Sequence, residues 1–385
     1  MAEPHDLPEH LREVLAHQPR ASLAVASALA GNPTHAYALI GPAGSGKRAA
    51  ARGLAAELLA QGSADPDRAR ARGLAVPSPH PDLVWLSPSG NQHLVDDVRE
   101  GVIGAVHFRP FEGHRRVFVI EAADAMAEES QNALLKTLEE PPSYAHLILI
   151  SAEPDGLLET VRSRCRRVDF QPLPPDVAEA ELARRVDAPA AEIAAAVALA
   201  GGDLDRAELL LSEHGRRLRE LVERSLAAAL AGELASRPWA ELSSVAADIG
   251  AERGREVELA ARAKATELGK GRDAARVKRE GAEAAKRADR RARTEVLDLA
   301  LGLCVSAAID LIALAEGGGE LVRNGDRIDA LQRIATDLDQ RAAREAADAA
   351  MDARRRLRVN ANEELALDAV FHRVALALGD RLPVG

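Results

Sequence analysis

The segment Gly41–Lys47 reads Gly-Pro-Ala-Gly-Ser-Gly-Lys, a phosphate-binding loop that is complete to its lysine. Its glycines, Gly41, Gly44 and Gly46, let backbone amides approach an anion, and the following helix N-terminus adds positive potential. The next residue of such a loop is Ser or Thr, because that hydroxyl holds the magnesium ion bridging the terminal phosphates. Here that residue is Arg48. The sequence therefore predicts a P-loop fold with altered metal chemistry.

The second motif of such an ATPase, the pair of acids that follows a buried strand, is also altered. The apolar run Val117–Ile120 reads as a buried strand, and in an ATPase of this kind it ends in two acids. One acid serves the metal and the other orients the attacking water. This strand ends in Glu121-Ala122, so a methyl group replaces the second carboxylate. We expect the chain to use this architecture for something other than hydrolysis.

Occupancy of the loop stays open at this stage. Lys47 is present and can hold the phosphates of ATP or ADP. The alternative is an empty loop kept for packing, with Arg48 pointing into solvent.

Composition narrows the class of protein. The 385 residues suffice for two or three domains, and an apolar content of 47% excludes a disordered chain. Only 2 Trp, 2 Tyr and 5 Phe occur, so the cores must consist mostly of Ala, Leu and Val. The net charge of −10 argues against a general polyanion binder, and any nucleic-acid contact must come from a local patch.

The cysteines and the apolar runs exclude further classes. Cys165 and Cys304 are the only cysteines and lie far apart, which excludes a disulfide framework or a four-cysteine zinc site. The sequence shows no signal-peptide pattern and no uninterrupted run of about eighteen apolar residues. We therefore expect a cytoplasmic protein that makes no membrane contact.

Strands and helices alternate in the first part of the chain. Short apolar runs predict strands over 36–40, 83–86, 117–120 and 147–150, with helices between them and a loop over 62–81. Such alternation implies a parallel sheet covered on both faces, hence an α/β fold. The strand signal ends near Pro172, and the remainder reads as helical. The expected domains are 1–171 (P-loop), 172–213 (a small helical lid) and 214–385 (an all-helical domain with a charged insertion at about 252–293).

Several motifs resemble one family. They are Asn132–Pro142 (Asn-Ala-Leu-Leu-Lys-Thr-Leu-Glu-Glu-Pro-Pro), Ser163-Arg164-Cys165, His35-Ala36-Tyr37 and Val95–Arg99. Together they resemble the AAA+ subunits of the bacterial DNA polymerase III clamp loader. The resemblance is dense over residues 30–175 and weaker beyond, where Asn360-Ala361-Asn362 is similar to the start of the family's last helix.

This resemblance implies a RecA-like AAA+ domain, a lid and a helical collar that carries the ring contacts. Within the family, the altered phosphate-loop and strand motifs resemble the non-hydrolysing delta prime type rather than the gamma/tau ATPase. The implied partners are gamma/tau and delta subunits, with the sliding clamp and primed DNA reached through the assembled complex. The implied role is to help load the clamp during DNA replication.

Arg164, between Ser163 and Cys165, is the main candidate functional residue. In the resembled family this arginine completes the ATP site of a neighbouring subunit, and a guanidinium on developing phosphate charge is worth roughly 10³–10⁵ in rate. The alternative is a solvated or salt-bridged arginine, since Arg162, Arg166 and Arg167 crowd the same place. Cys165 is expected to be a small core residue rather than a nucleophile.

Three departures from the family follow from the residues. The stretch 60–80 lacks the four cysteines of a zinc module, so no zinc is expected. Arg206 lies one position late for an arginine that senses the γ-phosphate from the lid. In 252–293 acids interleave with bases and aromatic residues are absent, which favours a solvated helix or flexible insertion over a nucleic-acid site.

Two rival interpretations remain. In the first, the chain is an active AAA+ ATPase, either of the gamma/tau type or a recombination motor. In the second, it is a scaffold that neither binds nucleotide nor touches a neighbour's site. Arg48 and Ala122 argue against the first, and Arg164 separates the second from the interpretation above.

Overall fold

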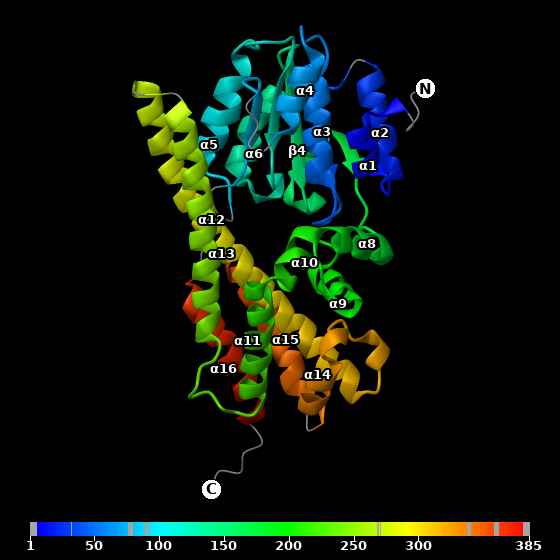
Figure 1. Ribbon diagram of the computed structural model, residues 1–385, viewed down its shortest axis with the longest axis vertical. Coiled ribbons are helices and arrows are strands. Elements are labelled where there is room, and N and C mark those ends of the chain that lie inside the picture. Colours follow the sequence, from blue (N-terminus) through cyan, green and yellow to red (C-terminus); the bar gives the residue numbers. More distant parts are fainter. Residues whose placement is uncertain are drawn as a thin grey trace. The chain divides into compact units, whose positions relative to one another are not determined.

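A computed structural model describes residues 6–31, 33–75, 80–88, 92–267, 269, 271–336, 340–357 and 362–379. The chain forms two compact units, Met1–Leu173 and Pro174–Gly385. Figure 1 shows that the first combines a sheet with helices and that the second is helical.

The first unit carries all five strands of the described chain. The strands are β1 (Ala36–Ile40), β2 (Leu83–Leu86), β3 (Arg116–Ile120), β4 (Ala145–Ser151) and β5 (Arg166–Asp169). Its helices are α1 (Glu9–Leu15), α2 (Pro19–Ala30), α3 (Lys47–Ala60), α4 (Pro66–Leu74), α5 (Val95–Val98), α6 (Glu128–Glu139) and α7 (Glu159–Arg162). Helix α5 continues as a π-helical segment, Arg99–Gly104, and a 3₁₀ turn, Ala105–His107.

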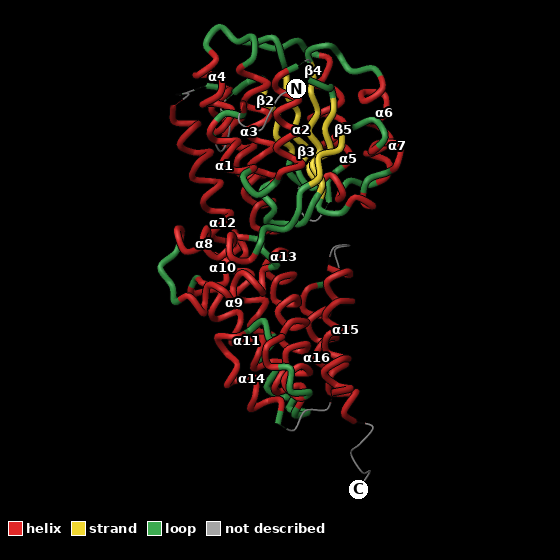
Figure 2. The backbone as a smooth tube through the Cα atoms, turned by 90° about the vertical axis from the view of Figure 1, so that its right-hand side faces the viewer, coloured by secondary structure: helices red, strands yellow, loops and turns green. Residues whose placement is uncertain are grey.

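The sheet is wholly parallel, with the strand order β2-β3-β4-β1-β5. Helices cover both of its faces, as Figure 2 shows with the strands in yellow. Because β1 lies between β4 and β5, the loop that follows β1 leaves the sheet from its interior rather than from an edge. The phosphate-binding loop is therefore held from both sides.

Alternation along the strands divides the core into two layers. Val117, Val119, Ile148 and Ile150 pack with helices α1–α3, while the intervening Phe118, Ile120, Leu147 and Leu149 pack with the helical segments between Val95 and Arg162. Successive strand residues point to opposite faces, and a parallel sheet needs both faces apolar. The apolar runs seen in the sequence meet this requirement.

The second unit is helical in its described residues. Its helices are α8 (Pro175–Arg185), α9 (Ala190–Ala200), α10 (Leu204–Leu211), α11 (Glu213–Leu230), α12 (Ala240–Glu267), α13 (Arg272–Ala315), α14 (Ile328–Ala335), α15 (Gln340–Leu357) and α16 (Glu363–Gly379). Gly201 and Gly202, at φ 63° and 82°, make the turn between α9 and α10. Helix α16 is capped by Asn362, whose side chain accepts the Leu365 amide at 3.0 Å. The adjoining Asn360 and Ala361 lie outside the described residues.

Helix α13 is the one described helix long and apolar enough to cross a membrane, which is weak evidence for a span. Two-thirds of its apolar window (67%) is buried within the protein, as in the core helix of a soluble protein. That window includes Asp298 and Asp310, whose carboxylates are paired inside the helical unit. We interpret α13 as a core helix.

Two secondary-structure predictions were wrong. The expected loop over 62–81 contains α4, which begins after Asp65, whose carboxylate accepts the Arg68 amide at 3.1 Å, with Pro66 in the first turn. Strand β5 was not predicted, because its sequence Arg-Arg-Val-Asp offers only Val168 as an apolar residue. Its place beside β1 rests on backbone pairing rather than on an apolar run.

Candidate functional site: the phosphate-binding loop and an exposed arginine

The loop between β1 and α3 has the backbone of a phosphate-binding loop. Gly44 and Gly46 have φ values of 75° and 85°, in the left-handed region where glycine costs least. Gly41 is needed for space, because a Cβ there would lie 2.5 Å from the Phe170 carbonyl oxygen. Gln18 braces the loop, donating to the carbonyls of Ser45 at 3.1 Å and Gln171 at 2.7 Å. The three candidate glycines and Lys47 all lie in this loop, at the start of α3.

Lys47 is turned toward its own loop. Its side chain is largely buried, and the ammonium donates to the Pro42 carbonyl at 2.7 Å. The Ser45 hydroxyl donates to the same carbonyl at 2.8 Å. In this conformation the lysine closes the loop on itself, with one of its three N–H donors on the Pro42 carbonyl.

Arg48 points toward the end of β3 and not simply into solvent. Its Nε lies 3.3 Å from Oε1 of Glu121, the acid that follows the strand. The other carboxylate oxygen of Glu121 accepts hydrogen bonds from Trp85 Nε1 at 3.2 Å and from Ser87 Oγ at 2.7 Å. The residue replacing the magnesium hydroxyl therefore neutralises the carboxylate that would serve the metal. Sequence reasoning identified the substitution at Arg48 but missed this pairing.

Ala122, the residue that replaces the second acid, also has an uncommon backbone conformation. Its φ of 48° and ψ of 53° put it in the left-handed region, which is uncommon for a residue with a Cβ. His93 supports this turn, with Nε2 2.6 Å from the Glu121 carbonyl oxygen. The turn is fixed, but it carries a methyl group where hydrolysis needs a carboxylate.

Arg164 follows α7 and is exposed. Its guanidinium donates to the Thr160 carbonyl at 2.9 Å and forms an ion pair of 2.5 Å with Glu139, at the end of α6. An exposed ion pair contributes about 0–1 kcal/mol, so exchanging Glu139 for another anion costs little. The neighbouring arginines are ion-paired as well, Arg162 with Asp155 and Arg167 with Asp169.

Sheet register separates Arg164 from the loop of its own chain. Strand β5 runs parallel to β1, with Arg166 beside Tyr37 and Asp169 beside Ile40. Arg164 precedes β5, whereas the loop follows β1. Arg164 therefore lies at the amino ends of the parallel strands and the loop at their carboxyl ends. At about 3.3 Å per strand residue, they are roughly 15 Å apart along the strand direction. The structure does not bring the two candidate sites together.

The other two residues of the Ser-Arg-Cys motif have structural surroundings. The Ser163 hydroxyl donates to the Thr160 carbonyl at 3.2 Å. Burial raises the pKa of the Cys165 thiol to about 12, so the thiol stays protonated at neutral pH. A protonated thiol is a poor nucleophile, which agrees with the core role expected for Cys165.

Arg206 of α10 is engaged within the helical unit. It lies 3.3 Å from Asp298 of α13, and Arg354 of α15 binds the same carboxylate with two hydrogen bonds of 2.9 Å. Helix α10 is thus linked to α13 and α15 through one shared carboxylate.

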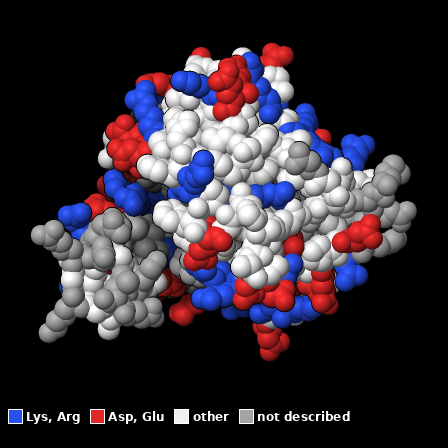
Figure 3. Space-filling model, turned by 90° about the horizontal axis from the view of Figure 1, so that it is seen from above, with Lys and Arg blue, Asp and Glu red and all other residues white. Residues whose placement is uncertain are grey.

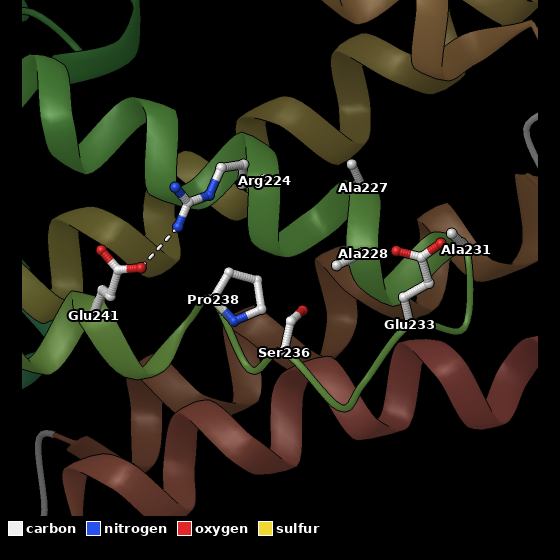
Figure 4. A pocket seen from close by; sticks show the side chains of 8 residues that line it. All are labelled: Arg224, Ala227, Ala228, Ala231, Glu233, Ser236, Pro238 and Glu241. Carbon is white, nitrogen blue, oxygen red and sulfur yellow. Dashed lines mark hydrogen bonds and ion pairs between the residues drawn. The ribbon is translucent and has the colours of Figure 1, made fainter.

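Other features of the described residues supply no chemistry. No group of three or more His, Cys, Asp or Glu among them is arranged to hold a metal ion. A hollow of about 570 Å³ in the helical unit, seen in Figure 4, is lined by alanines of α11 and by the residues that follow it. Arg224 and Glu241 face each other across its rim at 2.8 Å. Their charges neutralise each other, so the hollow carries no catalytic group.

Comparison with known proteins identifies relatives of the first unit. Residues 18–174 match the family described as DNA polymerase III, delta subunit. The chain is also similar to DNA polymerase III subunit delta' of Pseudomonas aeruginosa, with 39% identity over 214 residues. That alignment covers 54% of this chain and 65% of the relative.

A second group of relatives has a different subunit name. DNA polymerase III subunit gamma/tau of Mycobacterium bovis is 37% identical over 160 residues, which cover 40% of this chain and 27% of that protein. A solved structure of a DNA polymerase III gamma subunit-related protein from Thermotoga maritima superposes with a TM-score of 0.43 and 16% identity, covering 93% of this chain and 99% of that one.

Proposed function

Because this chain belongs to the DNA polymerase III family that includes the delta' and gamma/tau subunits, we propose that it is a non-hydrolysing clamp-loader subunit of the delta' type. In this role it joins gamma/tau and delta subunits in a ring that loads the sliding clamp on primed DNA. It supplies Arg164 to the ATP site of a neighbouring subunit. It works in the cytoplasm as a ring member rather than as a motor.

The observation that carries the non-hydrolysing role is the Arg48–Glu121 ion pair. Hydrolysis at a phosphate-binding loop requires a hydroxyl and a carboxylate for magnesium and a second group for water. In this chain the hydroxyl is missing, the first carboxylate is paired with Arg48, and Ala122 replaces the second. Any ATP or ADP held by Lys47 would therefore be bound without being turned over.

The isolated chain should hydrolyse ATP no faster than its Lys47→Ala variant. Both proteins lack the metal hydroxyl and the acid at position 122, so removing Lys47 takes nothing from catalysis. Steady-state phosphate release measures this. A turnover of roughly one per second, at the low end of ordinary enzymes, that disappears in the lysine variant would instead favour the active gamma/tau-type ATPase.

The position of Arg164 supports its action on another chain. It is exposed, forms an exposed ion pair with Glu139, and lies at the amino ends of the strands, whereas its own loop lies at their carboxyl ends. A guanidinium there can meet phosphates only if a neighbour presents them. The planar fork of arginine suits two phosphate oxygens at once, whereas lysine offers a single point charge.

Arg164→Ala should slow ATP hydrolysis at the one neighbouring site in a reconstituted ring, by roughly 10³–10⁵ there. Total ATPase should fall only in part, because the other sites keep their own arginines, while clamp loading should fall more. Arg164→Lys should recover little. DNA-stimulated ATPase and clamp loading are measured in rings that carry only this change.

Arg162→Ala is the matched control, since Arg162 is a nearby arginine paired with Asp155. It should leave both rates near wild type, and both variants should assemble normally by size-exclusion chromatography. Unchanged rates in the Arg164→Ala ring would leave the chain as a scaffold. Equal losses in the two variants would reduce the effect to local charge.

A further inference from the structure

The loop-side halves of α12 and α13 form an antiparallel pair, here called the hairpin arm (residues 250–293). Glycines allow the two backbones to approach closely. A Cβ on Gly250 would lie 2.4 Å from Asp289 Oδ1, and one on Gly281 would lie 2.2 Å from the Ala261 Cβ. Small residues at such contacts let two helices pack without large apolar side chains. The arm is therefore a built pair of helices rather than an irregular insertion.

The arm contributes little to the core of the helical unit. Its buried apolar side chains are alanines such as Ala285 and Ala292, each 9% exposed, whereas large buried residues of α13 begin with Val296 and Leu297. Figure 1 shows the loop end of the arm extending beyond the other helices of the C-terminal unit.

The charge of the arm is opposite to that of the chain. The arm contains fourteen Lys or Arg and eight Asp or Glu, a net charge of +6 in a chain whose net charge is −10. Twelve of these bases and five of these acids lie in residues 262–293. In contrast, the view of the molecule in Figure 3 shows basic and acidic side chains scattered around a broad uncharged area. The segment 262–293 is thus a local concentration of positive charge.

Several of these bases are exposed and aligned. Arg279, Lys286 and Arg290 of α13 are exposed at spacings of seven and four residues, which puts them on one face of the helix. At 1.5 Å per residue the row spans about 16 Å. Arg255 and Arg262 form a second exposed row on α12.

The bases of these two rows keep their charge exposed to solvent. Lys286 and Arg262 form ion pairs with Glu283 and Glu258, and both bases remain more than half exposed, at 68% and 57%. In the described part of the arm, no carboxylate partner is found for Arg279 or Arg290. The arm therefore presents more positive charge than its own acids neutralise.

We propose that the hairpin arm binds the phosphate backbone of duplex DNA without reading its sequence. Duplex DNA presents regularly spaced phosphates along its length, and exposed Lys and Arg bind them with release of counterions. Residues 250–293 contain no Phe, Trp or Tyr, so the arm lacks the rings on which single-stranded bases stack. This inference depends on the charge and geometry of the arm and is independent of Arg164.

The test compares the isolated full chain with its triple variant Arg279→Gln/Lys286→Gln/Arg290→Gln. Glutamine keeps helix propensity while removing charge. The control, Arg184→Gln/Arg217→Gln/Arg224→Gln, removes the same charge from exposed arginines on α8 and α11. Fluorescence anisotropy reports binding of a labelled 30-base-pair duplex, a single strand and polyglutamate at several NaCl concentrations, and circular dichroism checks helix content.

The wild-type chain should bind the duplex with a log-affinity that falls linearly with log salt, at about 0.9 per phosphate contact. The arm variant should lose roughly tenfold or more in affinity and about 2–3 from that slope, while the control should change less than twofold. The proposal is overturned by no duplex binding in low salt or by equal losses in both variants. Preferential binding to the single strand, or to polyglutamate as an acidic protein surrogate, also overturns it.

Discussion

Arg48 shows how one substitution changes the chemistry of a site without removing its shape. The loop keeps its glycines and lysine, and its backbone keeps the left-handed turns at Gly44 and Gly46. The guanidinium provides a fixed positive charge beside Glu121. Because this positive charge belongs to a side chain, its presence beside Glu121 does not depend on the concentration of free metal.

His146 provides a prediction about pH. It lies buried in β4, donates through Nδ1 to the Thr34 carbonyl at 3.0 Å, and stacks against His35. Burial lowers its pKa from 6.5 to about 4. The folded state therefore holds a neutral imidazole at pH values where the unfolded chain binds a proton, so stability should decrease as pH falls from 6.5 to 4.

The loss attributable to His146 should reach roughly 3 kcal/mol, at 1.36 kcal/mol per pKa unit. Urea unfolding between pH 4 and 7.5 measures it as the difference between the wild type and His146→Gln, which removes this titration but leaves the carboxylates. The variant should show the shallower dependence on pH. Parallel curves for the two proteins would contradict the prediction.

Among the elements, Gly41 joins the loop to strand β5. Its α-carbon faces Phe170, at the end of β5, with no room for a methyl group. Gly41→Ala should lower the free energy of unfolding by about 1–3 kcal/mol, the usual cost of overpacking. Chemical denaturation measures this against Gly31→Ala, where the nearest atom to an added Cβ is 3.8 Å away. A smaller loss at Gly41 than at Gly31 would be inconsistent with the tight contact.

The elements also show what could be predicted from the sequence. Strands β1, β3 and β4 were predicted because buried parallel strands are continuous apolar runs. Strand β5 was not predicted, because its backbone pairing to β1 needs no apolar sequence. Helix α4 was missed because the stretch 62–81 is rich in Pro, Gly and Asp, which is typical of a loop, although proline is favoured in the first turn of a helix.

The candidate site was predictable only in part for the same reason. Arg48, Ala122 and Arg164 stand out by their place in local motifs. Glu121 contacts Arg48, and Glu139 contacts Arg164, only because strands and helices that are distant in the sequence pack together. Local spacing carries no information on such contacts.

For the whole molecule, the division at Leu173–Pro174 predicts an independent first unit. A fragment of residues 1–173 should be soluble and unfold cooperatively, because it contains the whole sheet and both core layers. We further expect it to fail to join gamma/tau and delta subunits, since the helical unit is proposed to carry the ring contacts. Calorimetry and co-purification measure the two properties. Assembly as complete as that of the full chain would contradict the second.

The carboxylate of Asp298 is shared by Arg206 of α10 and Arg354 of α15. Opening α10 alone would take one of the two arginines away from Asp298. It would also expose Leu210, a fully buried residue of α10. Proteins open locally in cooperative segments. We expect a partly buried carboxylate shared by two helices to join them in one such segment. The backbone amides of α10 should therefore exchange with deuterium at rates that follow those of α15, a helix that lies over a hundred residues further along the chain.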